Sequence, residues 1–338
     1  MANPLLKSTS TILGIESSCD DTSASIIQNG EIRSNIISSQ EIHRKYGGVV
    51  PELASRAHQS HIIPVINEAL ETAKVSKKDL NAIAVTQGPG LMGSLIVGLN
   101  TAKGLAMSLG IPLIGVNHLR AHVSALRIEN KIEYPMLCLL VSGGHTQLIL
   151  QHSENNTEII GSTIDDAVGE AFDKGSKIIG LGYPGGPVIA KLAEKGNRDF
   201  HIFPDSQTKQ LDFSFSGIKT SLLYWLRKEI ENNSEFLIEH REDICASYEK
   251  SLVNMLLKRV KKALKIHDVR SLGLVGGVSA NKLLRKEMTA LGNSHKLQVY
   301  IPSFEYCTDN AAMIAKAGEI LFRHDDCIGL EAKPYTRA

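Results

Sequence analysis

Two histidines at helical spacing are the first residues in this sequence that suggest chemistry. His118 and His122 stand four residues apart in the segment NHLRAH, directly after a short apolar stretch that predicts a strand. In a helix this spacing places both imidazoles on one face, where they can bind one metal ion. The chain contains 12 histidines, so the spacing alone is weak evidence. Two surface or core histidines explain it as well.

A metallopeptidase would need a glutamate beside the first histidine. The HExxH motif provides that glutamate as the general base for a zinc-bound water, whereas Leu119 follows His118 here. Two histidines and a distant carboxylate with open coordination positions would instead suit iron or zinc acting as a Lewis acid. Asp309 is one of several candidate carboxylates, but it precedes a helix predicted over 311–321, and helix capping explains it equally well.

Glycine clusters are the second chemical feature. They occur at Ser142-Gly143-Gly144, at Gly185-Gly186 and at Gly276-Gly277. Glycine lets backbone N–H groups approach a phosphate or ribose closely, and a following helix N-terminus adds a favourable dipole. None of the clusters matches a Walker or Rossmann pattern, so each by itself is as typical of a turn. Together they favour a nucleotide site.

These residues lie in elements that the sequence repeats. A strand, polar turn and strand are predicted over 11–27 and again over 136–150. A strand, glycine turn, helix and second strand are predicted over 79–116 and again over 268–301. Short matches of this kind also arise by chance in α/β proteins, but two in the same order favour an internal duplication with parallel strand pairs.

The length of 338 residues favours two lobes over a single core. We expect a first lobe over 10–135, with a C-terminal helix over 310–325 packing back on it. A second lobe is expected over 136–309, with an insertion within 151–267. We expect a cleft between the two lobes.

Charge excludes a polybasic nucleic-acid binder. The chain has 37 Lys+Arg and 36 Asp+Glu, a formal net charge of +1, so any nucleic acid must be bound by a local surface. The lysine-rich run over 258–265 is typical of a solvated helix face. A glycine-rich stretch between Arg44 and Arg56 predicts a functional loop.

Cysteine usage and hydropathy favour a cytoplasmic protein. The 5 cysteines are far apart and form no CxxC pair, which argues against a disulfide framework or a thiolate zinc site. The N-terminus does not read as a secretory signal. The uncharged segment 80–102 is interrupted by QGPG, so it predicts a strand, a turn and a buried helix, and we expect no membrane partner.

Several longer segments then occur in a fixed order along the chain, and they include ILGIESSCDDTSASI, YGGVVPELASRAH, TQGPGLMGSLIVG, GVNHLRAHV, LLVSGGHTQL, IDDAVGEAFDKGSKIIGLGYPGGP, DFSFSGIKTS, LVGGVSANKLLR and CTDNAAMIAKAG. In these segments, from about Ile12 to Leu321, the chain closely resembles the tRNA N6-adenosine threonylcarbamoyltransferase family, TsaD in bacteria, formerly labelled O-sialoglycoprotein endopeptidases. The resemblance implies the duplicated actin, Hsp70 and sugar-kinase fold (ASKHA), an α/β fold with a nucleotide cleft between its two lobes.

The resemblance also implies an activity and site residues. The activity is transfer of threonylcarbamoyl from threonylcarbamoyl-adenylate to N6 of the adenosine 3′ of the anticodon, with release of AMP. The metal ligands fall on His118, His122 and Asp309, and they would hold one divalent ion, Fe²⁺ ahead of Zn²⁺. Glu16 falls near the cleft, and we hypothesise that it helps to remove the amine proton. The implied substrate-binding positions are Leu140, Val141, Ser142, Gly143, Gly144, Asp173, Gly186 and Asn281.

The implied partners are tRNA, a TsaB-like paralogous protein and a TsaE-like small ATPase. Two alternative functions remain at this point. An ATP-dependent kinase or ATPase of the same fold would not need the histidine pair. A metallopeptidase is less favoured because the glutamate after His118 is missing.

Overall fold

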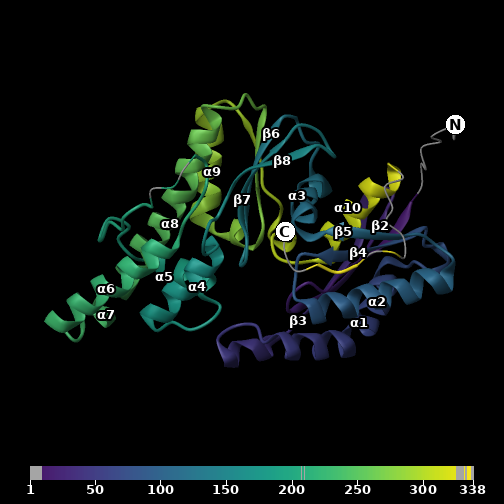
Figure 1. Ribbon diagram of the computed structural model, residues 1–338, viewed down its shortest axis with the longest axis horizontal. Helices are drawn as coiled ribbons and strands as arrows, with labels where there is room; N and C mark the ends of the chain where they lie inside the picture. Colours follow the sequence, from purple (N-terminus) through teal and green to yellow (C-terminus); the bar gives the residue numbers. More distant parts are fainter. Residues whose placement is uncertain (1–9, 207, 209, 325–330, 332, 336–338) are drawn as a thin grey trace. The chain divides into compact units, whose positions relative to one another are not determined.

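Two five-stranded sheets organise the chain, one in each of two compact units (Figure 1). The computed structural model describes residues 10–206, 208, 210–324, 331 and 333–335. The first unit combines Met1–Asn130 with Asp309–Ala338, and the second is the continuous segment Lys131–Thr308. The first unit is therefore built from both ends of the sequence.

The first unit contains a mixed sheet with strand order β3-β2-β1-β4-β5. β1 pairs antiparallel with β2 and parallel with β4. Its described elements are β1 (Thr11–Glu16), β2 (Asp21–Gln28), β3 (Glu31–Ser39), η1 (Glu41–Tyr46), α1 (Pro51–Ala73), η2 (Lys77–Asp79), β4 (Ala82–Gly88), α2 (Met92–Leu109), β5 (Leu113–Asn117), α3 (His118–Glu129) and α10 (Ala311–Arg323).

Side chains of β1 point alternately to the two faces of this sheet, and helices cover both faces. Leu13 and Ile15 belong to a core shared with α1 and α2, which lie side by side in Figure 1. Successive strand residues point to opposite faces, so Gly14 faces α10. A Cβ on Gly14 would stand 2.6 Å from the Ala311 carbonyl oxygen. Only glycine therefore lets the α10 backbone come this close to the sheet.

The second unit contains a sheet of the same design, with strand order β10-β9-β6-β7-β8. β6 pairs antiparallel with β7 and parallel with β9. Its described elements are β6 (Met136–Val141), β7 (Thr146–Gln151), β8 (Thr157–Ser162), α4 (Val168–Ile179), α5 (Gly185–Ala193), α6 (Ser216–Asn232), α7 (Phe236–Glu239), α8 (Arg241–Leu264), β9 (Ser271–Val275), η3 (Gly277–Ala280), α9 (Lys282–Ser294), β10 (Gln298–Tyr300) and η4 (Phe304–Tyr306).

Both repeats predicted from the sequence are present in the sheets. The central strand of each has an antiparallel neighbour that follows it directly and a parallel neighbour that comes later in the chain. The connection between β8 and β9 carries α4 to α8, whereas the connection between β3 and β4 carries α1 and two 3₁₀ helices. The duplicated two-lobe α/β fold is therefore confirmed.

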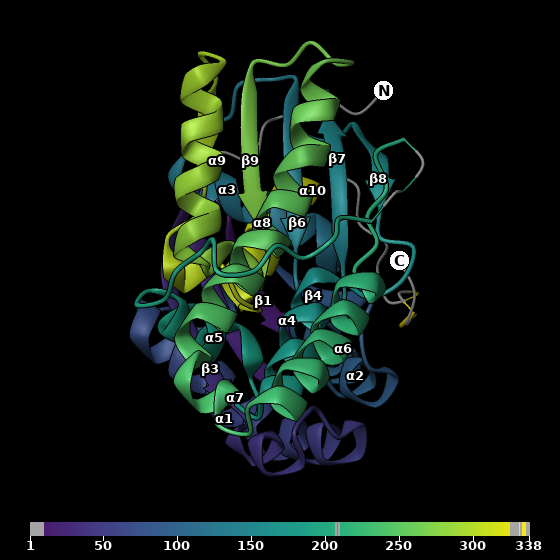
Figure 2. The same cartoon turned by 90° about the vertical axis from the view of Figure 1, so that its left-hand side faces the viewer.

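Apolar residues of β6 and β7 form the second core with α4, α5, α8 and α9. Figure 2 shows α8 and α9 running along the sheet of this unit. Tyr248, on α8, is the largest fully buried side chain among the described residues, and its hydroxyl donates a hydrogen bond to the Ala171 carbonyl at 2.9 Å. This bond ties α8 to α4, which carries one of the predicted substrate-binding residues.

Two local expectations can be compared with these elements. The segment 80–102 forms β4, a turn and the start of α2, as its glycine and proline residues predict. None of the described helices has the length and apolar character needed to cross a membrane. The glycine-rich stretch before Arg56 is a loop only as far as Val50, because α1 begins at Pro51. Proline suits the first turn of a helix, where its missing N–H costs nothing.

Candidate functional site

The start of α3 places the two histidines. The side chain of Asn117 accepts a hydrogen bond from the Arg120 backbone N–H at 2.9 Å and so caps the helix at the end of β5. His118 and His122 follow one turn apart, both buried. Their rings meet edge to face with centroids 4.8 Å apart. The helical position predicted from their spacing is confirmed.

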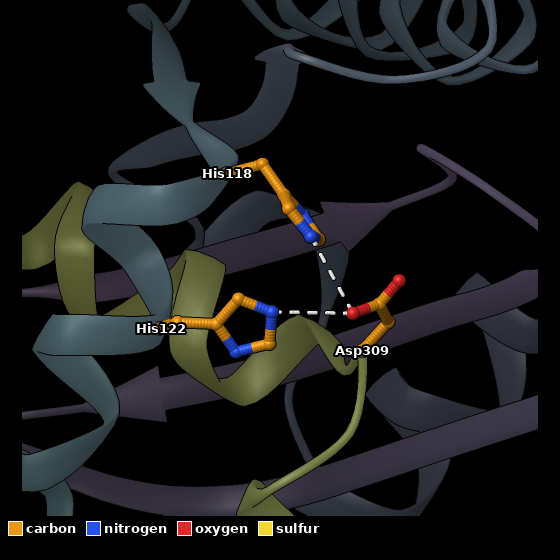
Figure 3. Close-up of side chains that lie close together, drawn as sticks. All are labelled: His118, His122 and Asp309. Atoms are coloured by element: carbon orange, nitrogen blue, oxygen red, sulfur yellow. Dashed lines mark ion pairs between the residues drawn. The ribbon is translucent and has the colours of Figure 1, made fainter. Parts of the chain in front are cut away.

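Asp309 completes the cluster from the other end of the first unit's sequence (Figure 3). Its Oδ1 atom lies 3.2 Å from His122 Nε2 and 3.4 Å from His118 Nε2. The capping explanation for Asp309 is wrong, because the Asn310 side chain caps α10 by accepting from the Met313 backbone N–H at 3.1 Å. This arrangement lets the Asp309 carboxylate point at the histidines.

Glu16 lies behind His118 at the end of β1. Its Oε2 atom is 3.0 Å from His118 Nδ1 and accepts a hydrogen bond from the Thr86 hydroxyl at 2.6 Å. Its Oε1 atom accepts from the Ser18 backbone N–H. A carboxylate bonded to one ring nitrogen fixes the tautomer and leaves the other nitrogen available as a ligand. Glu16 thus directs His118 Nε2 toward Asp309.

Charge in the cluster favours a bound cation. Burial disfavours the imidazolium form of His118, but the carboxylates of Asp309 and Glu16 outweigh it and hold the pKa of His118 well above its usual value. Burial likewise opposes ionisation of Glu16 and Asp309, and the neighbouring His118 holds the pKa of each below its usual value. With His118 protonated, the two ionised carboxylates still leave the cluster with a net negative charge. A divalent metal would displace the proton of His118, because metals bind neutral imidazole and ionised carboxylate.

The donor set fits a metal. The ligand atoms of His118, His122 and Asp309 all lie within 4.8 Å of one another. Neither ring nitrogen of buried His122 makes a hydrogen bond of good geometry to a described residue, although Nε2 lies 3.2 Å from Asp309 Oδ1. Such an unsatisfied buried donor or acceptor is costly unless something else binds it. Asp309 keeps 26% of its side chain exposed, so a further ligand can reach the site.

The predicted substrate-binding glycines lie in the second unit, at the carboxyl ends of β6 and β9. Leu140 and Val141 end β6, and Ser142 begins the turn that contains Gly143 and Gly144. A Cβ added at Gly143, Gly144 or Gly277 would meet no other atom within 4 Å. These backbone segments are therefore open to a ligand, at the end of the sheet where α/β folds bind nucleotides.

Two further glycines bring this turn and its neighbours together. Gly276 has a φ of 90°, and a Cβ there would collide with the Val141 carbonyl. Gly169, at the start of α4, lies so near the turn that its Cβ would stand 2.6 Å from the Ser142 carbonyl oxygen. Close backbone approach at both positions requires glycine.

Asp173 and Gly186 form the next part of this surface. Asp173 Oδ1 accepts a hydrogen bond from the Gly185 backbone N–H at 2.7 Å, and the Gly186 N–H also donates to this carboxylate. Burial raises the pKa of Asp173 above its usual value, against the effect of those two donors. Asp173 therefore ties α4 to the first turn of α5.

Asn281 caps α9 and contacts a buried acid. Its Oδ1 accepts from the Leu284 backbone N–H at 2.9 Å, while its Nδ2 donates to Glu249 Oε1 at 2.7 Å. Burial raises the pKa of Glu249, and the bond from Asn281 lowers it in part. The predicted residues thus divide between the units: Glu16 and the metal ligands in the first, the other eight in the second.

The site contains residues that the sequence reasoning did not single out. Thr86 and Ser18 both bond to Glu16, and each lies in a segment already noted for its motif. Glu249 had no local signal, because it is one acid among many charged residues on α8. Its burial and its bond to Asn281 emerge only from the packing of α8 beside η3 and α9.

Solved structures place the fold in the actin, Hsp70 and sugar-kinase class. Full-length HypF in its phosphate- and nucleotide-bound form is similar with a TM-score of 0.62 and 13% identity, over 98% of this chain and 48% of that one. Component A of the Acidaminococcus fermentans (R)-2-hydroxyglutaryl-CoA dehydratase gives 0.56 and 16%, over 94% and 99%. At these identities the likeness concerns the fold alone.

Sequence comparison then defines the family. The family model for TsaD, tRNA N6-adenosine threonylcarbamoyltransferase, matches residues 31–316. A protein of that name from Porphyromonas gingivalis is 49% identical over 332 residues, which cover 96% of this chain and 97% of the relative. One from Salinibacter ruber is 51% identical over 310 residues, covering 91% and 93%. This chain belongs to the tRNA N6-adenosine threonylcarbamoyltransferase family.

Proposed function

We propose that this protein transfers threonylcarbamoyl from threonylcarbamoyl-adenylate to N6 of the adenosine 3′ of the anticodon in tRNA, releasing AMP. The observation that carries this proposal is the buried cluster of His118, His122 and Asp309 in a chain that matches enzymes of this name over nearly its whole length. The metallopeptidase alternative is not favoured, since Leu119 occupies the position of the general base.

The reaction exchanges one bond at the carbamoyl carbon for another. A bond forms from adenosine N6 to that carbon, the bond from the carbon to the phosphate oxygen of the adenylate breaks, and AMP leaves with the electron pair. N6 loses one proton. Because the lone pair of N6 is delocalised into the ring, N6 is a weak nucleophile, and the carbonyl must be polarised. A divalent metal held by His118, His122 and Asp309 would supply that Lewis-acid polarisation.

We propose iron(II) as the metal, with zinc as the second choice. Two histidines and one carboxylate with open positions are the ligand set of non-haem iron(II) sites. Imidazole and carboxylate also bind zinc, so the ligand types alone do not exclude it. Metal analysis of protein purified without oxygen distinguishes the two ions.

The adenylate would lie against the glycine turns of the second unit. In this proposal, backbone N–H groups of Gly143 and Gly144 bind the phosphate, where no side chain obstructs them. Asp173 orients the first turn of α5 around Gly186 through its bond to the Gly185 N–H. The side-chain amide of Asn281 already bonds to Leu284 and Glu249. In this proposal, its remaining donor and acceptor capacity binds the adenylate.

We assign Glu16 the role of orienting His118, in place of the proton-accepting role suggested by the sequence. Its carboxylate is fully buried and is already bonded to His118, Thr86 and Ser18. A general base must come within hydrogen-bond reach of the proton that it removes. These contacts favour a residue that acts through His118.

The proposal includes the partners that the family resemblance implies, a TsaB-like paralogue and a TsaE-like small ATPase. It also includes a cytoplasmic location, in keeping with a tRNA substrate. Family membership supports each of these statements, which remain to be tested with the purified proteins.

Nucleoside mass spectrometry on tRNA tests the activity. Unmodified tRNA is incubated with threonylcarbamoyl-adenylate, the partner proteins and either the native chain or the His118→Ala/His122→Ala variant. We expect modified adenosine with the native chain and at least a hundredfold less with the variant. A His152→Ala/His295→Ala variant is the matched control, because both of those histidines are exposed.

Two results would contradict the proposal. No modified adenosine with folded native chain and competent partners would remove the transferase assignment. ATP hydrolysis or phosphoryl transfer that is indifferent to loss of His118 and His122 would instead favour the kinase or ATPase alternative.

A further inference from the structure

A basic hollow lies between the C-terminal half of α8 and four residues that precede α6, Asp205, Ser206, Thr208 and Gln210. Its volume is about 900 Å³. Five of its described lining residues are basic and one is acidic, and none is aromatic: they are Asp205, Ser206, Thr208, Gln210, Asn254, Leu257, Lys258, Arg259, Lys261, Lys262 and Lys265. None of them belongs to the candidate metal or nucleotide site. The hollow is thus a separate cationic feature of the second unit.

Arg259 is the structural anchor of this hollow. Its guanidinium donates to Asp205 Oδ1 at 2.8 Å and to the Ser206 carbonyl at 2.7 Å, and only 6% of its side chain is exposed. Lys258 shares the same Asp205 carboxylate at 2.5 Å. One acid therefore compensates two cations, and it also holds the wall of the hollow in place.

Among the described residues, the other lysines have no such compensation. Lys262 donates to the Gln210 backbone carbonyl at 2.6 Å, which leaves its charge unneutralised. Lys261 and Lys265 are exposed, and neither pairs with a carboxylate in the part of the chain that the structure describes. The hollow thus keeps an excess of positive charge at its rim.

Helix stability does not account for this cluster. Lysines in the last turn are favourable because they face the negative end of the helix dipole. However, Lys258, Lys261, Lys262 and Lys265 are related by spacings of three and four residues, and like charges at these spacings repel by about 0.2–0.5 kcal/mol per pair. This repulsion offsets much of the favourable dipole effect, so the cluster gives the helix little net stability, and a bound anion would relieve the repulsion.

We propose that this hollow binds the phosphate backbone of the tRNA substrate through Lys258, Lys261, Lys262 and Lys265. This inference rests on the proposed function for the identity of the polyanion. Flexible lysines without aromatic neighbours contact phosphates but do not stack on bases or read them. The hollow therefore orients tRNA without selecting its sequence. Because the whole chain carries a net charge of +1, such a local surface is needed for electrostatic attraction.

The test is equilibrium binding of unmodified tRNA to the full chain, measured by fluorescence anisotropy over a series of salt concentrations beginning at about 50 mM. The test variant is Lys261→Gln/Lys265→Gln, since neither lysine has a carboxylate partner in the described structure. The control, Lys228→Gln/Lys286→Gln, removes the same charge from exposed positions on α6 and α9. Thermal unfolding checks that both variants remain folded.

We expect the test variant to bind tRNA about tenfold more weakly at low salt and to lower the slope of log affinity against log salt by about 1 to 2, as loss of one or two phosphate contacts requires. The control should stay within about twofold of the native chain. Equal losses in both variants, or no salt-sensitive binding by the native chain, would overturn the proposal.

Inorganic phosphate at matched ionic strength is a second probe. If phosphate displaces tRNA no better than chloride does, the hollow recognises the repeated phosphates of a nucleic-acid backbone. If phosphate displaces tRNA at concentrations where chloride does not, the hollow is a single-phosphate site and the inference is overturned.

Binding of tRNA does not depend on catalysis. If tRNA is bound through Lys261 and Lys265 but never modified, the proposed function fails while this surface stands. If tRNA is modified but the variant binds it as the native chain does, the proposed function stands and this surface is refuted.

Discussion

At the scale of single residues, the environment of each carboxylate separates two roles. Asp309 retains an exposed fraction of 26% and points between the two histidines, whereas Glu16 is completely buried behind one of them. An acid that is still accessible can serve as a ligand to an ion that arrives from solvent. An acid enclosed by His118, Thr86 and Ser18 can only act through those neighbours. These environments support our proposal that Asp309 binds the metal and that Glu16 positions His118.

This division predicts the effect of Glu16→Gln. The amide keeps nearly the same shape and can still accept from His118 Nδ1, but it removes the negative charge that makes His118 a stronger ligand. Loss of such an outer partner lowers metal affinity by about 10- to 100-fold. Chelator competition measures that affinity, with Glu68→Gln, an exposed acid on α1, as the control.

The same variant distinguishes orientation from proton removal. If Glu16→Gln binds metal as the native chain does but transfers no threonylcarbamoyl, Glu16 is the proton acceptor and our assignment is wrong. If activity returns when metal is supplied in excess, the orienting role is supported. Glu16→Ala should lose more affinity than Glu16→Gln because it also removes the hydrogen bond.

At the scale of elements, α10 holds the first unit together. It contacts β1, β2, β4 and α3, and the segment before it provides Asp309. Its approach to β1 depends on Gly14, where a Cβ would stand 2.6 Å from backbone atoms of Ala311 and Ala315. Backbone atoms cannot rotate away as a side chain can, so the whole helix would have to shift.

We therefore expect Gly14→Ala to destabilise the first unit by about 1–3 kcal/mol or more, as overpacking does, and to weaken metal binding because Asp309 moves with α10. Gly104→Ala is the control, since Gly104 is exposed on α2 and a Cβ there meets nothing within 4 Å. That variant should be stabilised by about 0.5–1 kcal/mol. Thermal unfolding measures both, and equal stability of the two variants would refute the argument.

At the scale of the whole molecule, the two units differ in how the chain builds them. The second is one continuous segment with its own extended core. The first needs residues from both ends of the sequence, because α10 covers one face of its sheet. A domain with a complete core can fold alone, whereas one that lacks a covering helix exposes apolar surface.

This difference predicts how two fragments of the chain should unfold. Residues 131–308 alone should unfold cooperatively, whereas residues 1–130 alone should not. A chain that joins residues 1–130 to 309–338 through a flexible linker should recover cooperative unfolding and metal binding. Far-UV circular dichroism during heating provides the measurement. Cooperative unfolding of fragment 1–130 without residues 309–338 would show that α10 is dispensable.

The sequence by itself determined the local elements and the duplication. The periodicity of residues 92–109 and the apolar run 136–141 coincide with α2 and β6. The histidine spacing places both rings on one face of α3. These inferences succeed because hydrogen bonding within a helix, and alternation along a strand, depend on residues only a few positions apart. The family, and the ligand set that we propose, followed from motif resemblance, which carries information about distant residues that periodicity lacks.

Only the tertiary structure decided what depends on distant contacts. Glu16 meets His118 across 102 positions of sequence, and its burial there is the reason that we propose a positioning role for it in place of a proton-accepting one. Asn310, and not Asp309, caps α10, although either residue type suits that position. The lysine face of α8 reads as ordinary solvated surface until Asp205 and Gln210 pack beside it to form a hollow. Each outcome depends on which segments pack together, because packing determines burial and the charges that each side chain meets.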